Sequence, residues 1–132
     1  TIVFFDDNII GKPENGEHAY SILEQLSGNT HQVFSGFSIL NKDSSEEITD
    51  VICTEVRFQK LDAEMIEWYV NSGEPFGKAG AYSIQGLGTI LVESISGSYN
   101  NVVGFPIEKI IPHLTANAWI SFAGKINMEV SS

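Results

Sequence analysis

Two long runs of strand-forming residues constrain the fold of this 132-residue chain more than any other feature. His31 to Leu40 reads HQVFSGFSIL, which is rich in β-branched and aromatic residues, and Ile48 to Phe58 alternates apolar and polar side chains. Alternation with a period of two is typical of a strand that buries one face. Because residues 41–45 have the composition of a polar turn, the two runs are predicted to pair as adjacent strands of a meander.

Two amphipathic helices are predicted on either side of these strands. The first spans Glu17 to Ser27, with Gly28 placed for a left-handed cap, and its apolar face consists of Ala19, Ile22, Leu23 and Leu26. The second begins after Asp62, a good N-cap residue, and ends at Gly73. Its predicted buried stripe consists of Met65, Ile66, Tyr69 and Val70, with Leu61 packing against Ile66.

The chain begins directly with strand-forming residues 1–5. Asp6, Asp7 and Asn8 then predict a tight, solvated turn into a second short strand. Since domains commonly have a polar lead-in, this abrupt start leads us to expect further chain upstream of Thr1.

Glycines mark the second half of the sequence. Residues 74–88 hold four of the 12 glycines, and glycine lets the backbone approach a ligand closely. We predict a strand over 89–95, a loop over 97–104 and a helix from Pro106 to about Leu114. Residues 1–114 are predicted to form the domain, and 115–132 a C-terminal extension.

Composition narrows the classes of partner. The length fits one domain, and a hydrophobic content of 42% is sufficient for a core. A formal net charge of −10 argues against binding long nucleic acid or anionic lipid, because both require clustered basic residues. No run is long enough for a membrane span, and the single Cys53 excludes an internal disulfide. We therefore expect a cytoplasmic protein.

Common catalytic motifs are absent from the sequence. There is no GxxxxGK[ST] loop, GxGxxG, HExxH or GxSxG motif, and no pair of cysteines for zinc. His18, His31 and His113 are too scattered to indicate a shared metal site. These histidines, Cys53 and the two tryptophans are therefore interpreted as packing or surface residues.

A series of short motifs nevertheless resembles one family. In chain order they are Thr1-Ile2-Val3, Gly11-Lys12-Pro13, Leu26-Ser27-Gly28, His31-Gln32-Val33, Ser35-Gly36, Gly73-Glu74-Pro75, Lys78-Ala79-Gly80-Ala81-Tyr82, Ile84-Gln85-Gly86, Gly97-Ser98-Tyr99 and Asn101-Val102-Val103-Gly104-Phe105-Pro106. Their order over residues 1–114 resembles the Maf family of nucleoside triphosphate pyrophosphatases.

The resemblance implies hydrolysis between the α and β phosphates with a divalent metal, usually Mg²⁺. The KAGAY and IQG strings are similar to the branch that acts on dTTP, UTP and modified pyrimidine nucleotides. The implied fold is α/β: an α/β/α arrangement with a mixed sheet, related to inosine triphosphate pyrophosphatases. The first strand and helix of that fold would be lacking here.

Departures from the family pattern qualify this expectation. The family's serine- and arginine-bearing phosphate loop, a metal-site acid, a lysine and the catalytic aspartate lie before the position matched by Thr1. Gly77 stands where the family usually has Asp, and Ser83 replaces a common glycine. The metal ligands therefore stay unknown, and we expect little or no turnover from this chain alone.

Five residues are candidate site residues. Lys12 and Lys78 are predicted to contact phosphate, although each fits an ordinary solvated lysine, and Lys78 also fits a surface pair with Glu74. Glu74 is a candidate for substrate or metal binding. Gln85 offers a donor and an acceptor for a pyrimidine edge, or else ties two loops together. The resemblance implies that Gln85 and the position of Thr1 determine base choice.

Three interpretations stay open at this point. The first is a dTTP/UTP pyrophosphatase impaired by truncation, with a nucleoside triphosphate as its partner. The second is a non-catalytic remnant that binds nucleotide or another protein, including as a homodimer. The third is a piece that does not fold alone, because lost elements would expose a sheet edge and apolar faces.

Overall fold

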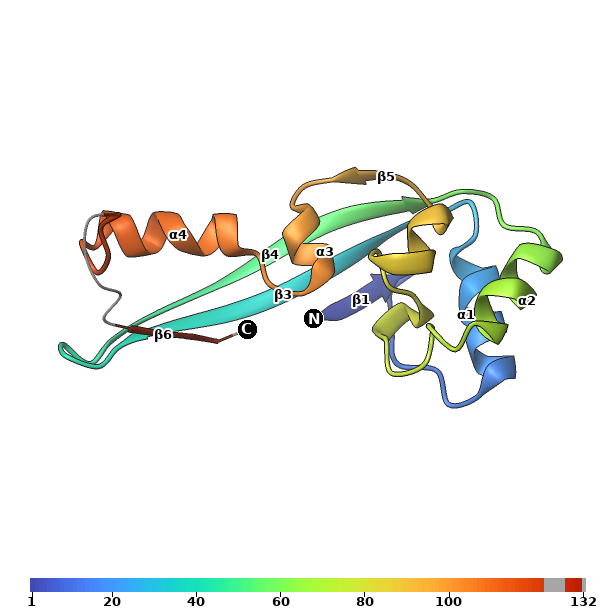
Figure 1. The fold of residues 1–132 in the computed structure, drawn as a ribbon, viewed down its shortest axis with the longest axis horizontal. Helices are drawn as coiled ribbons and strands as arrows, with labels where there is room; N and C mark the ends of the chain where they lie inside the picture. The colour runs from blue at the N-terminus through green and yellow to red at the C-terminus, as the bar shows by residue number, and fades with distance from the viewer. Residues whose placement is uncertain (123–127, 132) are drawn as a thin grey trace.

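The computed structural model describes residues 1–122 and 128–131 (Figure 1). The elements in chain order are β1 (Ile2–Phe5), β2 (Asn8–Ile10), α1 (Gly16–Leu26), β3 (Thr30–Asn41), β4 (Glu46–Phe58), α2 (Ala63–Asn71), the 3-10 turns η1 (Ala79–Ala81) and η2 (Gly86–Leu91), β5 (Val92–Ser96), α3 (Tyr99–Val103), α4 (Ile107–Ala116) and β6 (Met128–Ser131). The predicted α/β class is confirmed.

One sheet runs through the molecule in the strand order β2-β1-β3-β4-β5, and β6 also pairs with β3. The β3–β4 hairpin is its long axis, in register from Thr30 opposite Arg57 to Asn41 opposite Glu46. Every pairing among the described strands is antiparallel, so the mixed sheet implied by the resemblance does not occur in this part of the fold. Tight hairpins join β1 to β2 and β3 to β4, whereas the pairs β1–β3 and β4–β5 are antiparallel although helices lie between these strands in the chain.

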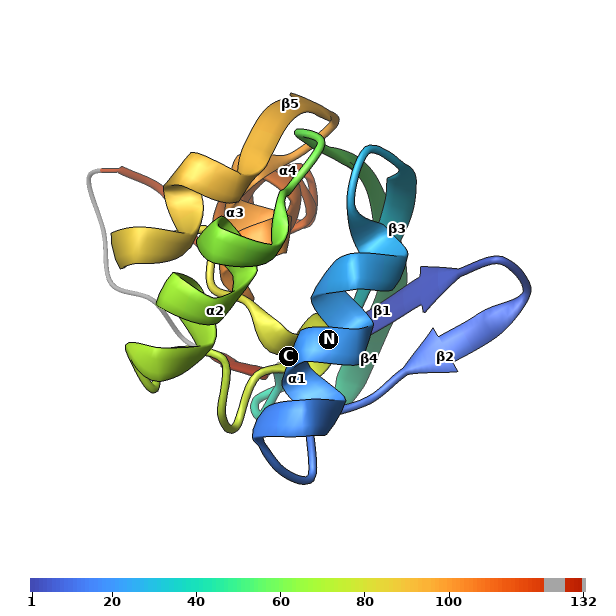
Figure 2. The same cartoon turned by 90° about the vertical axis from the view of Figure 1, so that its right-hand side faces the viewer.

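The helices cover a single face of this sheet. Alternate residues of β3, such as Val33 and Phe37, are buried under them, whereas Phe34 and Gly36 point to the other side. In the end-on view the helices lie to the left of β1, β2 and β3 (Figure 2). We call the two sides the covered face and the open face.

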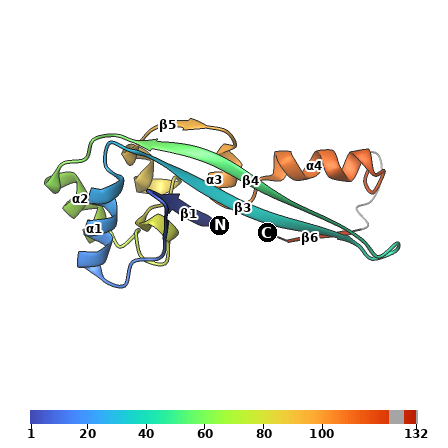
Figure 3. The same cartoon turned by 180° about the vertical axis from the view of Figure 1, so that it is seen from behind.

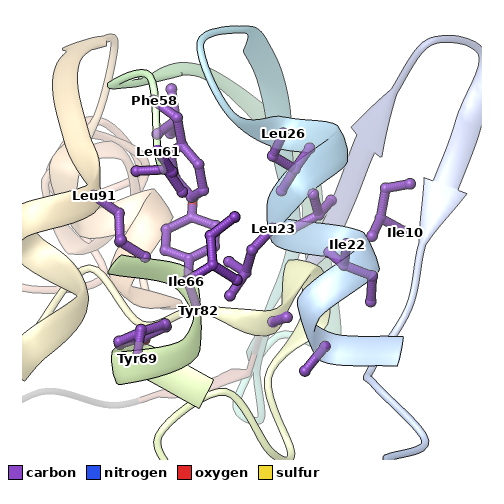
Figure 4. Close-up of a cluster of buried hydrophobic side chains, with 14 of the residues drawn as sticks. Ile10, Ile22, Leu23, Leu26, Phe58, Leu61, Ile66, Tyr69, Tyr82 and Leu91 are labelled. Atoms are coloured by element: carbon purple, nitrogen blue, oxygen red, sulfur yellow. The ribbon is translucent and has the colours of Figure 1, made fainter. Parts of the chain in front are cut away.

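A large apolar cluster joins α1, α2 and the 3-10 turns to the covered face. Leu23 and Leu26 of α1, Ile66 and Tyr69 of α2 and Phe58 of β4 belong to this cluster (Figure 4). Each of these five side chains is buried. We call this part of the molecule the body.

A smaller cluster lies at the far end of the hairpin. Ile110 and Leu114 of α4 pack on Phe37 and Ile39 of β3, with Trp119 at the edge. Figure 3 shows α4 running along the hairpin away from the body. We call the distal hairpin with α4 the arm.

Local capping and turn residues determine several element ends, as predicted. Asp62 caps α2 by accepting from the Met65 amide at 2.8 Å. Gly28 and Gly73 have φ of +67° and +81°, the left-handed values expected of glycines after a helix. Asp6 and Asp7, with φ of 51° and 62°, form the predicted exposed turn.

Three local predictions were wrong in part. Residues 89–91 belong to η2 rather than to a strand, which begins at Val92. The predicted loop 97–104 contains α3, capped by the Ser98 hydroxyl. Met65 and Val70 are only half-buried, so the fully buried stripe of α2 consists of Ile66 and Tyr69.

The segment predicted as a C-terminal extension contributes to the fold. Its first residues complete α4, and β6 pairs with β3 from Ser38 to Asn41. Residues 123–127 and 132 of this segment lie outside the described residues. No helix in the described part of the chain is both long and apolar enough to cross a membrane.

Candidate functional site

A cavity of about 390 Å³ opens on the body, on the covered side of β1. It is lined by Thr1, Val3, Lys12, Val33, Gly77, Lys78, Ala79, Tyr82, Ser83, Ile84, Gln85, Val102 and Val103. Four of the five predicted site residues are therefore brought to one cavity. Volumes of this size are ordinary for small-molecule sites.

Backbone contacts place the two lysines on the same wall. The Gly80 amide donates to the Gly11 carbonyl at 3.1 Å, which joins the residue before Lys12 to the turn after Lys78. Gly80 has φ of +75°, and a Cβ there would lie 3.1 Å from both methyl carbons of Val3. A side chain at position 80 would therefore push this turn away from β1.

The cavity wall is positively charged. Lys12 and Lys78 both line it and are exposed, and no Asp or Glu is among the lining residues. In a chain of net charge −10, this gathers positive charge at one place. Two ammonium groups without a carboxylate between them suit an anion such as phosphate.

Thr1 is held at the cavity by a buried polar network. Its Oγ1 lies 2.9 Å from the Ser35 Oγ, and Ser35 in turn donates to the Asn101 carbonyl at 3.4 Å. The Asn101 side chain is fully buried and donates to the Thr54 hydroxyl and to the carbonyls of Val33 and Ile52. The network ties α3 to both central strands behind the cavity.

Sequence reasoning assigned no role to Ser35, Thr54 or Asn101. Asn101 could not be recognised from the sequence, because α3 has five residues and is too short to show a periodicity that marks its inward face. The one usable signal was Ser98 three residues earlier, which accepts from the Asn101 amide at 3.0 Å as an N-cap.

Gln85 lies at the mouth of the cavity. It precedes η2, is exposed, and its side chain makes no hydrogen bond to the described residues. The alternative in which Gln85 ties two loops together therefore has no contact to support it. The side-chain amide of Gln85 is therefore available to bind a ligand.

Glu74 is directed away from the cavity. Its carboxylate accepts from the Tyr69 hydroxyl at 2.7 Å, from the Gly88 amide at 2.8 Å and from the Leu87 amide at 3.0 Å. Burial raises its pKa, but these hydrogen bonds, together with the positive charge of Lys78, outweigh burial and lower the pKa below its usual value. Glu74 is absent from the cavity lining, and its predicted contact with substrate or metal has no geometry in its favour.

Gly88 makes this arrangement possible. A Cβ at Gly88 would lie 1.9 Å from the Ser83 carbonyl oxygen and 2.8 Å from the Tyr69 hydroxyl oxygen. The Tyr69 hydroxyl also accepts from the Ser83 amide at 3.1 Å. Glu74, Tyr69 and Gly88 thus form a latch that holds residues 83–88, including Gln85, against α2.

The cavity floor rests on a buried aromatic group. Tyr82 places its hydroxyl 2.8 Å from His31 Nε2, and Phe58 packs edge-on against both rings. Burial lowers the pKa of His31 to about 4, so the imidazole is neutral at pH 7. Burial, together with Tyr69, raises the pKa of Tyr82.

The lining residues do not fit a metal site by themselves. Mg²⁺ is usually held by one or two carboxylates together with phosphate oxygens and water. In residues 1–122 and 128–131, no group of three or more His, Cys, Asp or Glu side chains could hold a metal ion. Gly77, where the family pattern has Asp, lines the cavity with φ of +81° and with nothing within 4 Å of an added Cβ.

Comparison with known proteins identifies the family of this chain. The sequence profile of the family described as Maf-like protein matches residues 1–117. The chain belongs to the Maf family.

Two relatives show how far the similarity reaches. A Clostridium perfringens (strain 13) protein named dTTP/UTP pyrophosphatase is 52% identical over 110 residues, and a Clostridium botulinum (strain Kyoto) protein of the same name is 50% identical over 110 residues. In both cases the match covers 83% of this chain and 57% of the relative. The chain thus spans little more than half the length of these relatives.

Proposed function

We propose that this chain carries the substrate-binding wall of a pyrophosphatase that hydrolyses dTTP and UTP to the monophosphate and pyrophosphate. The observation that carries the proposal is the common cavity of Thr1, Lys12, Lys78 and Gln85. Relatives that share about half of the residues carry the name of this activity.

In this proposal, Lys12 and Lys78 bind the phosphates. Each ammonium supplies three donors and a full positive charge, which suits the oxygens of a triphosphate. Lys12→Gln and Lys78→Gln are each expected to weaken UTP binding about tenfold or more, since a hydrogen bond to a charged group contributes roughly 1.5–3 kcal/mol. Calorimetric titration measures the loss, with the exposed Lys60→Gln as the matched control.

In this proposal, Gln85 and Thr1 select the base of the nucleotide. The Gln85 amide can donate to a carbonyl oxygen of uracil or thymine and accept from the ring N–H beside it. Gln85→Ala is expected to lower the preference for UTP over ATP about tenfold, because the base edge then loses its paired groups. A variant that keeps the preference of the unaltered chain would contradict the assignment.

The divalent metal remains part of the proposal, with ligands supplied largely from outside the described cavity wall. Gly77→Asp tests this by adding a carboxylate to the lining. We expect UTP binding by Gly77→Asp to become stronger on addition of Mg²⁺. Gly73→Asp is the control, because Gly73 also has φ of +81° and open space but lies outside the lining.

Hydrolysis needs a group that activates water, and the lining offers no carboxylate for that task. We therefore expect the chain to bind dTTP and UTP and to release pyrophosphate slowly or not at all. Pyrophosphate release with dTTP, UTP and Mg²⁺, compared with the Clostridium perfringens relative, decides this point. Equal rates would show that the general base lies within these residues.

A second candidate function is favoured by the same lack of carboxylates. In it, the chain is a non-catalytic module that binds pyrimidine nucleotide without cleaving it. Binding without turnover, retained when Mg²⁺ is removed, would support this function over the first. We place either activity in the cytoplasm, since a single cysteine suits a reducing compartment.

A further inference from the structure

A second hollow, of about 340 Å³, lies between α2 and η2 and is separate from the cavity already described. It is lined by Asp62, Glu64, Met65, Trp68 and Ile90, and none of these residues lines the first cavity. In the end-on view, α2 lies beside the segment that leads into β5 (Figure 2). We call this hollow the α2 groove.

The walls of the α2 groove are apolar side chains that reach the surface. Trp68 is 48% exposed and Ile90 39%, and Met65 is half-buried. Met65 and Trp68 are three residues apart in a helix, so they share one side of α2. Leu87 precedes Ile90 by three residues, on the same side of η2, and is 44% exposed. Grouped apolar side chains with a polar rim are typical of interaction sites.

Hydrogen bonds fix the two walls of the groove relative to each other. The Gln59 side-chain amide, before the start of α2, donates to the Ile90 carbonyl at 2.8 Å. The Leu87 amide donates to the carboxylate of Glu74, after the end of α2, at 3.0 Å. Because η2 is tied to the chain on both sides of α2, the groove needs little ordering to bind a partner, which favours binding.

Both charged residues of the groove lining are acidic. Asp62 and Glu64 lie at the start of α2, and neither takes part in the ion pairs found in the described part of the chain. The Asp62 carboxylate accepts from the Met65 amide at 2.8 Å and keeps lone pairs for a further donor. Lys60 lies outside the lining, with its Cβ close to Gly28 at the end of α1. A positively charged occupant is therefore favoured.

The distance between the acidic end and the tryptophan sets the spacing of groups in an occupant. Asp62 and Trp68 are six positions apart, which corresponds to about 9 Å along a helix. An extended peptide advances roughly 3.3 Å per residue, so side chains three positions apart span a similar distance. A small cation would reach one end of the groove only. The geometry therefore favours a peptide with a basic and an apolar residue about three positions apart.

We propose that the α2 groove binds a short extended segment of another protein. A Lys or Arg of that segment would lie against Asp62 and Glu64, and an aliphatic side chain between Trp68 and Ile90. A second copy of this chain is disfavoured, because its net charge is −10. The inference goes beyond the proposed function and does not depend on it, since the groove and the cavity share no lining residue.

Titration with a blocked hexapeptide tests the proposal. The probe has arginine at its second position, leucine at its fifth, and glycine or serine elsewhere. In two control peptides, citrulline replaces the arginine or alanine replaces the leucine. We expect the probe to change the fluorescence of Trp68, and each control peptide to bind about threefold more weakly or worse. No binding of the probe up to about 1 mM, or equal binding of the citrulline peptide, would overturn the proposal.

Substitutions in the groove show whether the probe binds there. Trp68→Ala removes the aromatic wall and is expected to weaken binding about tenfold or more. Trp68→Phe should bind the probe without the fluorescence change, since Trp119 lies in the arm. Glu64→Gln should weaken binding about threefold, whereas Glu67→Gln, on the exposed side of α2 outside the lining, should not. Equal weakening by Glu67→Gln would contradict docking in the groove.

Two other occupants are tested with the same signal. If n-butylguanidinium alone binds as tightly as the probe, the groove takes a free organic cation and the proposal is wrong. If the Trp68 emission changes as the unmixed chain is concentrated, and sedimentation shows a dimer, the occupant is a second copy and the proposal is also wrong. UTP affinity is measured separately. Binding of the probe by a chain that does not bind UTP would overturn the proposed function and support this inference.

Discussion

The body and the arm are built on the same two strands, yet they differ in what covers them. In the body, α1, α2, both 3-10 turns and α3 converge on the covered face and bury large side chains such as Phe58 and Tyr69. In the arm, among the described residues, α4 is the one helix on the hairpin, with Trp119 and Ile120 of the turn that follows it, and Pro112 removes one of its backbone donors. The cavity lies in the body, where several segments are held together, so the arm should be able to loosen without loss of the site.

Leu23→Ala tests the body and should have the largest effect. Leu23 is fully buried between α1 and the sheet, and such a truncation typically costs about 3–5 kcal/mol. We expect a lower free energy of unfolding and faster amide exchange throughout the body. Urea denaturation and hydrogen exchange measure the two effects, and exchange that speeds up only in α1 would contradict a single cooperative body.

Protonation of His31 should destabilise the body in mild acid. Burial lowers its pKa from 6.5 to about 4, so the unfolded chain binds the proton first. Stability from the neutral imidazole is complete above pH 6.5 and is lost as the pH falls toward 4, by up to about 3 kcal/mol. Urea denaturation across this range should show a steeper fall for the unaltered chain than for His31→Gln.

Leu114→Ala makes in the arm the same change as Leu23→Ala in the body. Leu114 is 2% exposed, but its cluster is small and can partly collapse after truncation. We therefore expect the free energy of unfolding to fall by about 2 kcal/mol, the lower limit for such Leu-to-Ala changes. Amide exchange should speed up in α4 and the distal hairpin, while UTP affinity stays unchanged. A fall in UTP affinity as large as that of Leu23→Ala would show that the two regions act as one.

Glu74→Gln should loosen the latch and lower the free energy of unfolding by about 1–2 kcal/mol, since it replaces a charged acceptor with a neutral one. The carboxylate has a lowered pKa in the folded chain, so its contribution is complete above its ordinary pKa and disappears as the pH falls through the lowered value. The stability difference from Glu67→Gln, an exposed control on α2, should therefore vanish in acid. UTP binding should also weaken, because the latch positions Gln85.

Asp50→Asn should have the smallest effect. Asp50 lies 3.4 Å from His113 in the arm, and both side chains are more than a third exposed, at 45% for Asp50 and 34% for His113. Exposed pairs contribute at most about 0.5–1 kcal/mol. A change in the urea midpoint well beyond that range would show that the arm depends on this pair more than on apolar packing.

Prediction from sequence succeeded where a local pattern decides the structure. Periodicity and caps located α1 and α2, and alternation located β3 and β4, because these signals act between neighbours in the chain. It failed at α3, which is too short to show periodicity, and at residues 89–91, where alternating residues form η2. The mixed sheet was an expectation from resemblance, and the described strands pair in the antiparallel sense alone.

For the site, the sequence by itself determined which residue types were at hand: two lysines, a glutamine and a threonine in motifs similar to the Maf family. The tertiary structure decided that these four share a cavity, that Glu74 serves a latch instead, and that Ser35 and Asn101 support Thr1 from behind. The reason is physical. A side chain's chemistry belongs to the residue, but its direction depends on contacts between segments distant in the chain, such as the 2.8 Å bond from Gly88 to Glu74.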